Sequence, residues 1–328
     1  MSSLFGSQDN FFSPVLDLDL LIHIGYISGE YTRVRGKEVW RVNPDGELRD
    51  VFGKTTAIFQ MEEEEFFARY QEGVSGNDDF LSNCREVYDK IYQQIPELPF
   101  SNIWCAKLIS KRLPENSVLH LGILNSLRSW NFFDIPDNVN AYSNVGGFGI
   151  DGNLSSLIGA SLSDKEKLFF GIVGDLAFFY DMNSVGNRHV GKNVRIMLIN
   201  NGRGTEFRNY NHPAQRFNDD ADYYMAAAWH YGNKSHELVK NYAENLGYEY
   251  ISARNKEDFL VSVERFLIPE ITDKPMLFEI FTDSKDESDA LFAVRNIIEK
   301  DTSISAKRIV KNVLGEKGIK FVKKIVGK

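Results

Sequence analysis

Polar residues follow two apolar, strand-like runs in the second half of the chain. Gly174-Asp175-Leu176 comes directly after one run, and Asn200-Asn201-Gly202-Arg203-Gly204 comes directly after the next, with Asn201 26 residues beyond Asp175. If one helix joins the runs in a right-handed β-α-β unit, both strand ends lie at the same edge of the sheet. A carboxylate, a carboxamide and backbone carbonyls are hard oxygen ligands, which Mg²⁺ prefers. The spacing therefore predicts a magnesium site that can clamp a diphosphate.

Each half of this pattern has a simpler interpretation. A Gly-Asp pair at a strand end and an Asn-Asn-Gly run are both common turn sequences. A second glycine-rich string, Gly146–Gly152, contains the Gly-x-Gly-x-x-Gly spacing of dinucleotide sites. The run before it, Val139–Ser143, is short, and no acid ends a second strand at a suitable distance, which argues against NAD binding.

The segment from Gly174 to Asn201 resembles the cofactor signature of thiamine-diphosphate-dependent enzymes, in which Gly-Asp-Gly or Gly-Asp-Leu precedes Asn-Asn. Other segments are similar to one branch of that family, the SEPHCHC synthases of menaquinone biosynthesis. These segments are Arg41–Asp50, Asn125–Leu127, Gly149–Gly152, Gly174–Asn183 and the late helices from Ala226 to Leu238. The resemblance covers residues 20–300 and implies a thiamine-diphosphate-binding α/β fold that acts as a 2-oxoacid decarboxylase or carboligase.

The resemblance implies a role for each matching residue. Asp175, the side chain of Asn201 and the carbonyl of Arg203 would bind Mg²⁺ (or Mn²⁺). The backbone near Leu176 and Ala177 would donate to diphosphate oxygens, as helix starts generally do. The implied cofactor-binding set is Asn125, Ser126, Leu127, Gly149, Ile150, Asp151, Gly174, Asp175, Leu176, Ala177, Asn201 and Arg203.

One residue and one short segment have implied roles around the thiamine ring system. Leu127 matches the bulky residue that wedges the cofactor into a bent form. Gly149 to Gly152 would allow the backbone to approach the pyrimidine side.

The chain departs from this family in one large respect. Family members carry an N-terminal pyrimidine-binding domain with a glutamate that protonates the cofactor, and no segment here matches that domain. The acids Glu62–Glu65 lie on an element that cannot replace it, and we read them as a solvated helix start. The catalytic residues are therefore unknown. We expect a homo- or hetero-oligomer with a pyrimidine-binding domain; the alternative is a non-catalytic cofactor-binding protein or a truncated remnant.

Substrate-binding positions also differ from the family pattern. Trp130 and Val145 stand where the branch has arginines, which weakens the case for a dicarboxylate, and Ala177 stands where it has a serine. The basic side chains that follow the metal motif could instead hold a small anionic 2-oxoacid, or they could belong to a solvated loop. They are Arg203, Arg208, His212 and Arg216.

The elements that must position these residues alternate between strand and helix. Expected strands cover 20–25, 39–43, 56–60, 117–122, 139–143, 167–174, 194–200, 248–252 and 275–282. Expected helices lie within 61–92, near 125, from 150, from 178, and over 236–246, 256–266 and 286–299. Such alternation predicts an α/β fold, a mostly parallel sheet with helices on both faces. We divide the chain into the rear part of a Rossmann-like central domain (1–95), a thiamine-diphosphate-binding domain (96–300) and a tail (301–328).

Composition sets the class of protein. A hydrophobic fraction of 43% and a charged fraction of 26% are typical of a globular chain, and a net charge of −8 argues against nucleic-acid binding. No apolar run reaches the roughly 18 residues that span a bilayer. The N-terminus lacks the pattern of a signal peptide, and two cysteines cannot form a disulfide scaffold. These features favour a cytoplasmic protein.

The last residues differ from the acidic body. Residues 306–328 contain eight Lys and Arg and one acid, Glu316, and their apolar residues recur at helical spacing. This pattern predicts a basic amphipathic helix, and we favour a terminal helix that docks on the acidic body. The alternative is a helix that contacts an anionic membrane peripherally.

Overall fold

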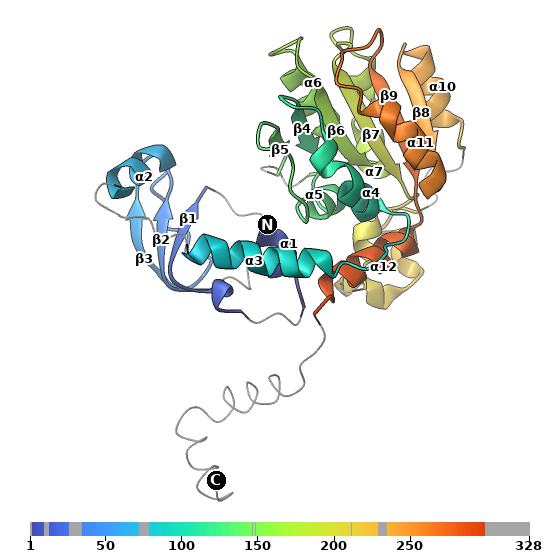
Figure 1. Cartoon of the computed structure of the whole chain (residues 1–328). Coiled ribbons are helices and arrows are strands. Elements are labelled where there is room, and N and C mark those ends of the chain that lie inside the picture. Colours follow the sequence, from blue (N-terminus) through green and yellow to red (C-terminus); the bar gives the residue numbers. More distant parts are fainter. Residues whose placement is uncertain are drawn as a thin grey trace, which may run out of the picture.

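The computed structural model describes residues 2–9, 13–25, 35–71, 79–145, 147, 149–210, 212–228 and 235–298. In this part of the chain the strands form two parallel sheets, one of three strands and one of six (Figure 1). Hydrophobic clusters lie on both faces of the larger sheet. The predicted α/β fold class is confirmed.

The smaller sheet contains β1 (Asp17–Ile24), β2 (Arg35–Val42) and β3 (Thr55–Phe59) in that order. Helix α2 (Glu63–Gln71) follows β3 and has three acids in its first turn, where the helix dipole favours negative charge. Its buried Phe66 contacts Phe59 of β3 at a ring-centroid distance of 4.9 Å. These elements are close to the expected ranges.

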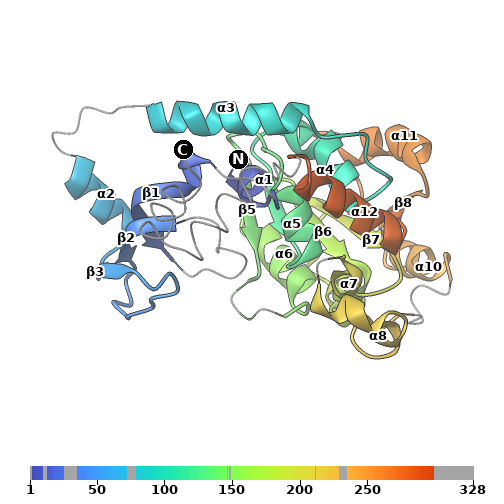
Figure 2. The same ribbon diagram turned by 90° about the horizontal axis from the view of Figure 1, so that it is seen from below.

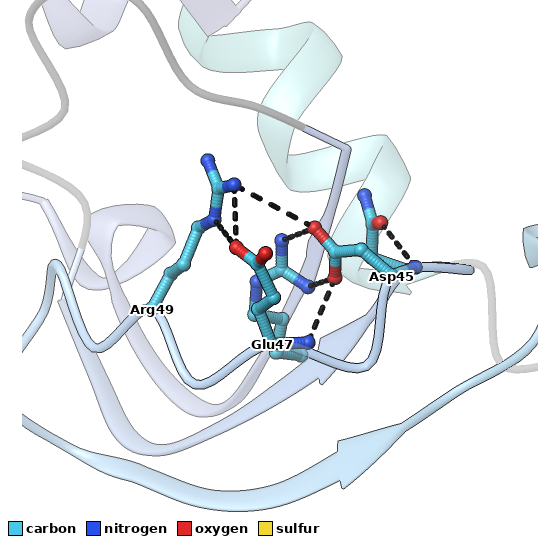
Figure 3. Close-up of polar contacts among 5 residues, drawn as sticks. Asp45, Glu47 and Arg49 are labelled. Atoms are coloured by element: carbon cyan, nitrogen blue, oxygen red, sulfur yellow. Dashed lines mark hydrogen bonds and ion pairs between the residues drawn. The ribbon is translucent and has the colours of Figure 1, made fainter.

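The turn after β2 is held by charged and amide side chains (Figure 3). The buried Arg41 donates from Nη1 and Nη2 to the two oxygens of Asp45 at 2.9 and 3.1 Å. Asp45 Oδ1 also accepts the Glu47 amide at 2.9 Å, and Glu47 accepts from Arg49 Nε at 2.9 Å. The predicted turn therefore has its own network of ion pairs.

The larger sheet has the order β5-β4-β6-β7-β9-β8, and all its pairings are parallel. Its strands are β4 (Val118–Leu121), β5 (Asn140–Ser143), β6 (Phe169–Gly174), β7 (Val194–Asn200), β8 (Glu249–Ala253) and β9 (Met276–Phe281). The chain passes outward from β4 to β5 and then returns to the other side of β4 with β6. The carboxyl ends of β4 and β6 therefore form a topological switch point, where ligands of such sheets bind.

Helices cover the two faces of this sheet through alternate strand residues. One face packs against α4 (Asn102–Ile109), α5 (Asn125–Trp130), α11 (Lys256–Phe266) and α12 (Ser284–Arg295). The other face packs against α6 (Asn153–Ser161), α7 (Asp175–Tyr180) and α10 (Leu238–Asn245). The central strands β6, β7 and β9 are buried on both faces, and their sequences are therefore almost continuously apolar.

Helices α1 (Ser2–Gly6) and α3 (Asp79–Gln93) connect the two units. Helix α3 extends between the smaller sheet and the larger unit in both views (Figures 1 and 2). Leu4 and Tyr88 belong to the same hydrophobic cluster as the helices on one face of the large sheet. That cluster crosses the predicted domain boundary at residue 95, and the boundary itself stays a prediction.

Several expected elements differ in detail. Helix α7 begins at Asp175 instead of Phe178, and α12 covers Ser284–Arg295 instead of 286–299. Helices α1 and α4 were not expected, and a four-residue helix α8 (Asp220–Tyr223) lies in the stretch expected to be irregular. Cys84 and Cys105 are buried free thiols. The basic segment 306–328 lies outside the described residues, and no described helix is long and apolar enough to cross a membrane.

Candidate functional site

The loops that follow β4, β6 and β7 surround one pocket of about 100 Å³ at the switch point of the large sheet. Nine of the twelve residues in the predicted cofactor-binding set line it. They are Asn125, Ser126, Ile150, Gly174, Asp175, Leu176, Ala177, Asn201 and Arg203. Segments that follow four strands, β4, β5, β6 and β7, thus converge where the sequence pattern places a ligand.

The other three predicted residues do not line this pocket. Leu127 is partly buried and packs against the main hydrophobic cluster, whereas its neighbour Leu124 lines the pocket with a φ of +65°. Gly149 and Asp151 lie beside Ile150 in the connection before α6, outside the pocket lining. The roles implied for these three residues stay predictions.

Asp175 lies at the junction of β6 and α7 with 2% of its surface exposed. Its Oδ2 accepts the Gly202 amide at 2.7 Å, and its Oδ1 accepts the Leu176 amide at 2.8 Å. Charge-assisted hydrogen bonds of this kind stabilise an ionised carboxylate. They also hold the loop after β7 beside the end of β6.

The two asparagines after β7 point in different directions, as successive strand residues do. Asn200 is buried and donates to Oε1 of Glu279 at 2.7 Å, and its Oδ1 has no hydrogen-bond partner among the described residues. Asn201 lines the pocket, and its Oδ1 accepts the Thr205 hydroxyl at 2.8 Å. The Thr205 amide donates to the Arg203 carbonyl at 2.9 Å. Thr205 therefore contacts both oxygen atoms that were predicted, with Asp175, as metal ligands.

Two further buried carboxyl groups lie near Asp175. Glu287 lines the pocket, and burial raises its pKa to about 7, although hydrogen bonds from the Thr282 hydroxyl and the Asn102 amide act to lower it. Burial also raises the pKa of Glu279, although hydrogen bonds from Asn200 and Tyr250 act to lower it. The charge of Asp175 raises the pKa of both glutamates further. A buried carboxylate whose charge raises the pKa of neighbouring carboxyl groups favours a nearby cation.

The part of the chain that the structure describes contains no group of three or more His, Cys, Asp and Glu side chains that could hold a metal ion. A cation in this pocket would therefore take ligands from one carboxylate, one carboxamide and a backbone carbonyl. Mg²⁺ accepts such a set because it usually completes its shell with water and phosphate oxygens.

The sequence pattern missed several residues that line the pocket. These are Asn102, Ile123, Leu124, Gly204, Thr205, Glu206, Phe207, Ile199 and Glu287. Thr205, Glu206 and Phe207 directly follow the Asn-Asn signature, so their position was a usable signal. Glu287 comes from α12, and only the fold brings that helix to the pocket.

Trp130, which stands where the family branch has an arginine, and the basic side chains after β7 have defined partners in the structure. Trp130 is 2% exposed, and its Nε1 donates to Oδ1 of Asn102 at 3.1 Å, so it belongs to the core.

Arg203 and Arg208 both contact the buried Asp222, at 2.8 and 3.7 Å. Two of the four basic side chains that were expected to meet an anionic substrate or solvent thus form an internal ion-pair cluster.

Two curated relatives share part of their sequence with this chain. The 2-succinyl-5-enolpyruvyl-6-hydroxy-3-cyclohexene-1-carboxylate synthase of Bacteroides fragilis is 32% identical over 77% of this chain and 44% of its own length. The synthase of the same name from Phocaeicola vulgatus is 32% identical over 78% of this chain and 44% of its own length. The chain therefore spans less than half the length of these relatives, and no model of a protein family matches it.

A solved structure supports the fold. The thiamine diphosphate-dependent 4-hydroxybenzoylformate decarboxylase of Rhodococcus jostii aligns with a TM-score of 0.57 at 17% identity, over 81% of this chain and 49% of that one. Together with the sequence relatives, this likeness confirms the family resemblance that the sequence motifs predicted.

Proposed function

Because this chain is related in sequence to the 2-succinyl-5-enolpyruvyl-6-hydroxy-3-cyclohexene-1-carboxylate synthases and spans less than half of them, we propose that it binds thiamine diphosphate and Mg²⁺ as part of such an enzyme. The reaction class would be decarboxylation of a 2-oxoacid, with or without transfer to an acceptor. One observation supports this most directly: nine predicted cofactor-binding residues line a single pocket at the switch point of the sheet.

The residues present fit a magnesium diphosphate. Asp175 supplies a buried charge, and Asn201 and Arg203 supply neutral oxygens on the adjacent loop. The pocket lies at the carboxyl ends of β4, β6 and β7, the carboxyl group of Glu287 lines it, and that of Glu279 lies close to Asp175. We propose that these three residues hold the cation and that the cation in turn holds the diphosphate.

When bound, thiamine diphosphate would supply the carbanion-stabilising chemistry that a 2-oxoacid decarboxylase needs. The protein would orient the cofactor and shape its surroundings. Leu124, Ile150 and Phe207 give the pocket an apolar side that would exclude water from the reacting end. Glu206 lies at the same pocket, and Arg128 holds its carboxylate through two hydrogen bonds of 2.6 and 3.1 Å.

We further propose that activity needs a pyrimidine-binding domain in addition to the residues of this chain, within a homo- or hetero-oligomer. Exposed aromatic side chains support a contact with another domain. Tyr180 at the end of α7 is 71% exposed. Tyr223 and Tyr224, further along the segment that follows β7, are 69% and 82% exposed. Such side chains, when clustered on a surface, mark interaction sites. The proposed compartment is the cytoplasm.

Calorimetric titration with thiamine diphosphate and Mg²⁺ tests the cofactor proposal. The wild-type chain should bind the pair, and Asp175→Asn should weaken binding by about tenfold or more because a charged metal ligand is lost. Asp273→Asn is a matched control, since Asp273 is exposed and pairs with Lys192 at 3.8 Å. Equal affinity in wild type and Asp175→Asn would show that Asp175 is not a metal ligand.

The second candidate is a protein that binds the cofactor without turnover. The burial of Trp130, at a position where the branch has an arginine, favours it. Release of CO₂ from a panel of 2-oxoacids, measured with a pyrimidine-binding domain added, separates the two candidates. Cofactor binding without CO₂ release would support the non-catalytic protein.

A further inference from the structure

A second cavity of about 230 Å³ adjoins the candidate cofactor pocket. Its charged and polar lining comes from Arg128, Glu206, Asn209, Tyr210, His212, Ser288 and Arg295, and its apolar lining comes from Pro213, Leu291 and Phe292. Glu206 lines both the cavity and the pocket. A molecule in the cavity would therefore lie next to a ligand in the pocket.

Arg128 presents only one edge of its guanidinium group to Glu206. Nη1 donates to Oε2 at 2.6 Å and Nη2 donates to Oε1 at 3.1 Å, and Nη1 also donates to Asn125 Oδ1 at 2.8 Å. Within the residues that the structure describes, Nε of Arg128 has no recorded partner. The edge formed by Nε and Nη2 therefore stays available, and it matches the two oxygens of a carboxylate.

The position of Arg128 is well defined. The Arg128–Glu206 pair joins α5 to the loop after β7, and Asn209 Nδ2 lies 3.2 Å from Asn125 Oδ1 and 3.3 Å from Glu206 Oε2. The Arg128 side chain keeps 31% of its surface exposed, compared with 17% for Glu206. Glu206 thus orients a cation that remains accessible from the cavity.

His212 adds a second donor. Its Nδ1 accepts the Ala214 amide at 3.1 Å, so in the neutral ring the proton is on Nε2. The other cations near the site are paired within the protein: Arg203 and Arg208 contact Asp222, and Arg295, which also lines the cavity, contacts Asp9 at 3.1 Å. The cavity thus offers the Nε and Nη2 edge of Arg128 together with the apolar side chains of Leu291 and Phe292.

We propose, building on the function proposed above, that this cavity binds the substrate and that the substrate is a 2-oxo monocarboxylic acid with an apolar side chain. The carboxylate contacts Nε and Nη2 of Arg128, and the side chain lies against Leu291 and Phe292. A second carboxylate placed against Leu291 and Phe292 would lose its hydration without compensation, and Arg295, the other cation of the lining, already pairs with Asp9. Arg128 is thus a specificity-determining residue.

Calorimetric titration of the whole chain with phenylpyruvate and with 2-oxoglutarate, in the absence of cofactor, tests the proposed substrate preference. Phenylpyruvate should bind at least about tenfold more tightly than 2-oxoglutarate. Arg128→Met should weaken phenylpyruvate binding by about tenfold or more, and Arg128→Lys should recover part of it, because an ammonium group cannot form the two-point contact. Arg112→Met is the matched control, since Arg112 pairs with Glu264 at 2.6 Å and does not line the cavity.

A second variant tests the same cavity independently if Arg128→Met fails to fold. Phe292 is 48% exposed, so Phe292→Ala should fold, weaken phenylpyruvate binding and leave pyruvate binding unchanged. Tighter binding of 2-oxoglutarate, or unchanged phenylpyruvate binding in both cavity variants, would overturn the inference.

Parallel titration with thiamine diphosphate and Mg²⁺ separates this inference from the proposed function. Cofactor binding without phenylpyruvate binding would refute only the cavity. Phenylpyruvate binding that depends on Arg128, in a chain that does not bind the cofactor, would refute only the cofactor proposal.

Discussion

The Gly202 amide donates a 2.7 Å hydrogen bond to Oδ2 of Asp175, and this bond joins the loop after β7 to the end of β6. Gly202 adopts a φ of +79°, a backbone conformation that side chains with a Cβ rarely adopt. The contact that places Asn201 and Arg203 beside Asp175 therefore depends on a glycine at this position.

Replacing Gly202 with alanine should destabilise the protein. We expect the free energy of unfolding of Gly202→Ala to fall by about 1 kcal/mol or more, because alanine is strained at positive φ. Gly159→Ala is a control with the opposite sign: Gly159 lies in α6, and an added Cβ there meets no heavy atom within 4 Å. It should raise stability by about 0.5–1 kcal/mol. Urea titrations of both variants that shift in the same direction would contradict this account.

The buried Glu287 predicts a pH-dependent stability. Its folded pKa of about 7 lies above the ordinary value of 4.5 because burial disfavours the ionised form. The favourable contribution of this group is therefore complete below the ordinary pKa and is lost as pH rises through 7. Glu287→Gln keeps an oxygen that can accept from the Asn102 amide and the Thr282 hydroxyl, and it cannot ionise.

The free energy of unfolding of wild type, relative to Glu287→Gln, should thus fall between about pH 5 and about pH 8, by up to about 3 kcal/mol. Urea titrations of the cofactor-free chain measure the difference. Glu264→Gln, at an exposed glutamate, should show no such trend. A flat difference for Glu287→Gln would mean that the carboxyl is ionised across this range.

Much of the fold could be predicted because buried parallel strands leave a direct signal. The expected ranges of β7 and α11 match the structure, since one is apolar throughout and the other has a clear amphipathic period and an Asn255 cap. Helix α4 was missed because five of its eight residues are buried on several sides, so its sequence has no polar face. Helix α7 was placed too late because it begins at Asp175 with no intervening loop.

The site was predictable where its residues are close in sequence. Asp175 and Asn201 lie at the ends of two adjacent strands, so the β-α-β rule brings them together. The sequence near Glu287 and Leu124 does not indicate a binding role for either residue. Glu287 reaches the pocket because α12 packs there, and Leu124 reaches it from a backbone conformation with positive φ. The substitution at Trp130 was visible in the sequence, but the burial of Trp130 and the partial exposure of Arg128 two positions earlier required the structure.

Arg195 is a buried cation in β7 that stabilises a distant loop. Nη1 donates to the carbonyl of Phe266 and Nη2 to that of Glu270, both at 2.7 Å, and Nη1 also contacts the carbonyl of Ile268. Burial lowers the pKa of Arg195 to about 10. Arg195→Met leaves these carbonyls without donors and should lower the free energy of unfolding by about 3 kcal/mol. Arg112→Met, which removes an exposed ion pair, should change it by less than about 1 kcal/mol in the same urea titration.

Thr205 predicts how the metal ligands are held. Its hydroxyl donates to Asn201 Oδ1 at 2.8 Å, its amide donates to the Arg203 carbonyl at 2.9 Å, and only 2% of its surface is exposed. Ser284 Oγ of α12 lies 3.1 Å from the same hydroxyl. Thr205 is therefore a positioning residue for two of the three proposed ligands, and α12 supports it from behind.

Thr205→Val keeps the shape and the amide and removes only the hydroxyl. Because groups behind metal ligands orient them, we expect the affinity for Mg²⁺, titrated calorimetrically with thiamine diphosphate present, to fall by about tenfold or more. Thr205→Ser restores the hydroxyl and should bind Mg²⁺ within about threefold of wild type. Thr272→Val is the matched control, since the Thr272 hydroxyl contacts the Lys274 carbonyl on the exposed surface at 3.0 Å. If the serine and valine variants lose the same affinity, the β-methyl group rather than the hydroxyl orients Asn201, and the positioning role is wrong.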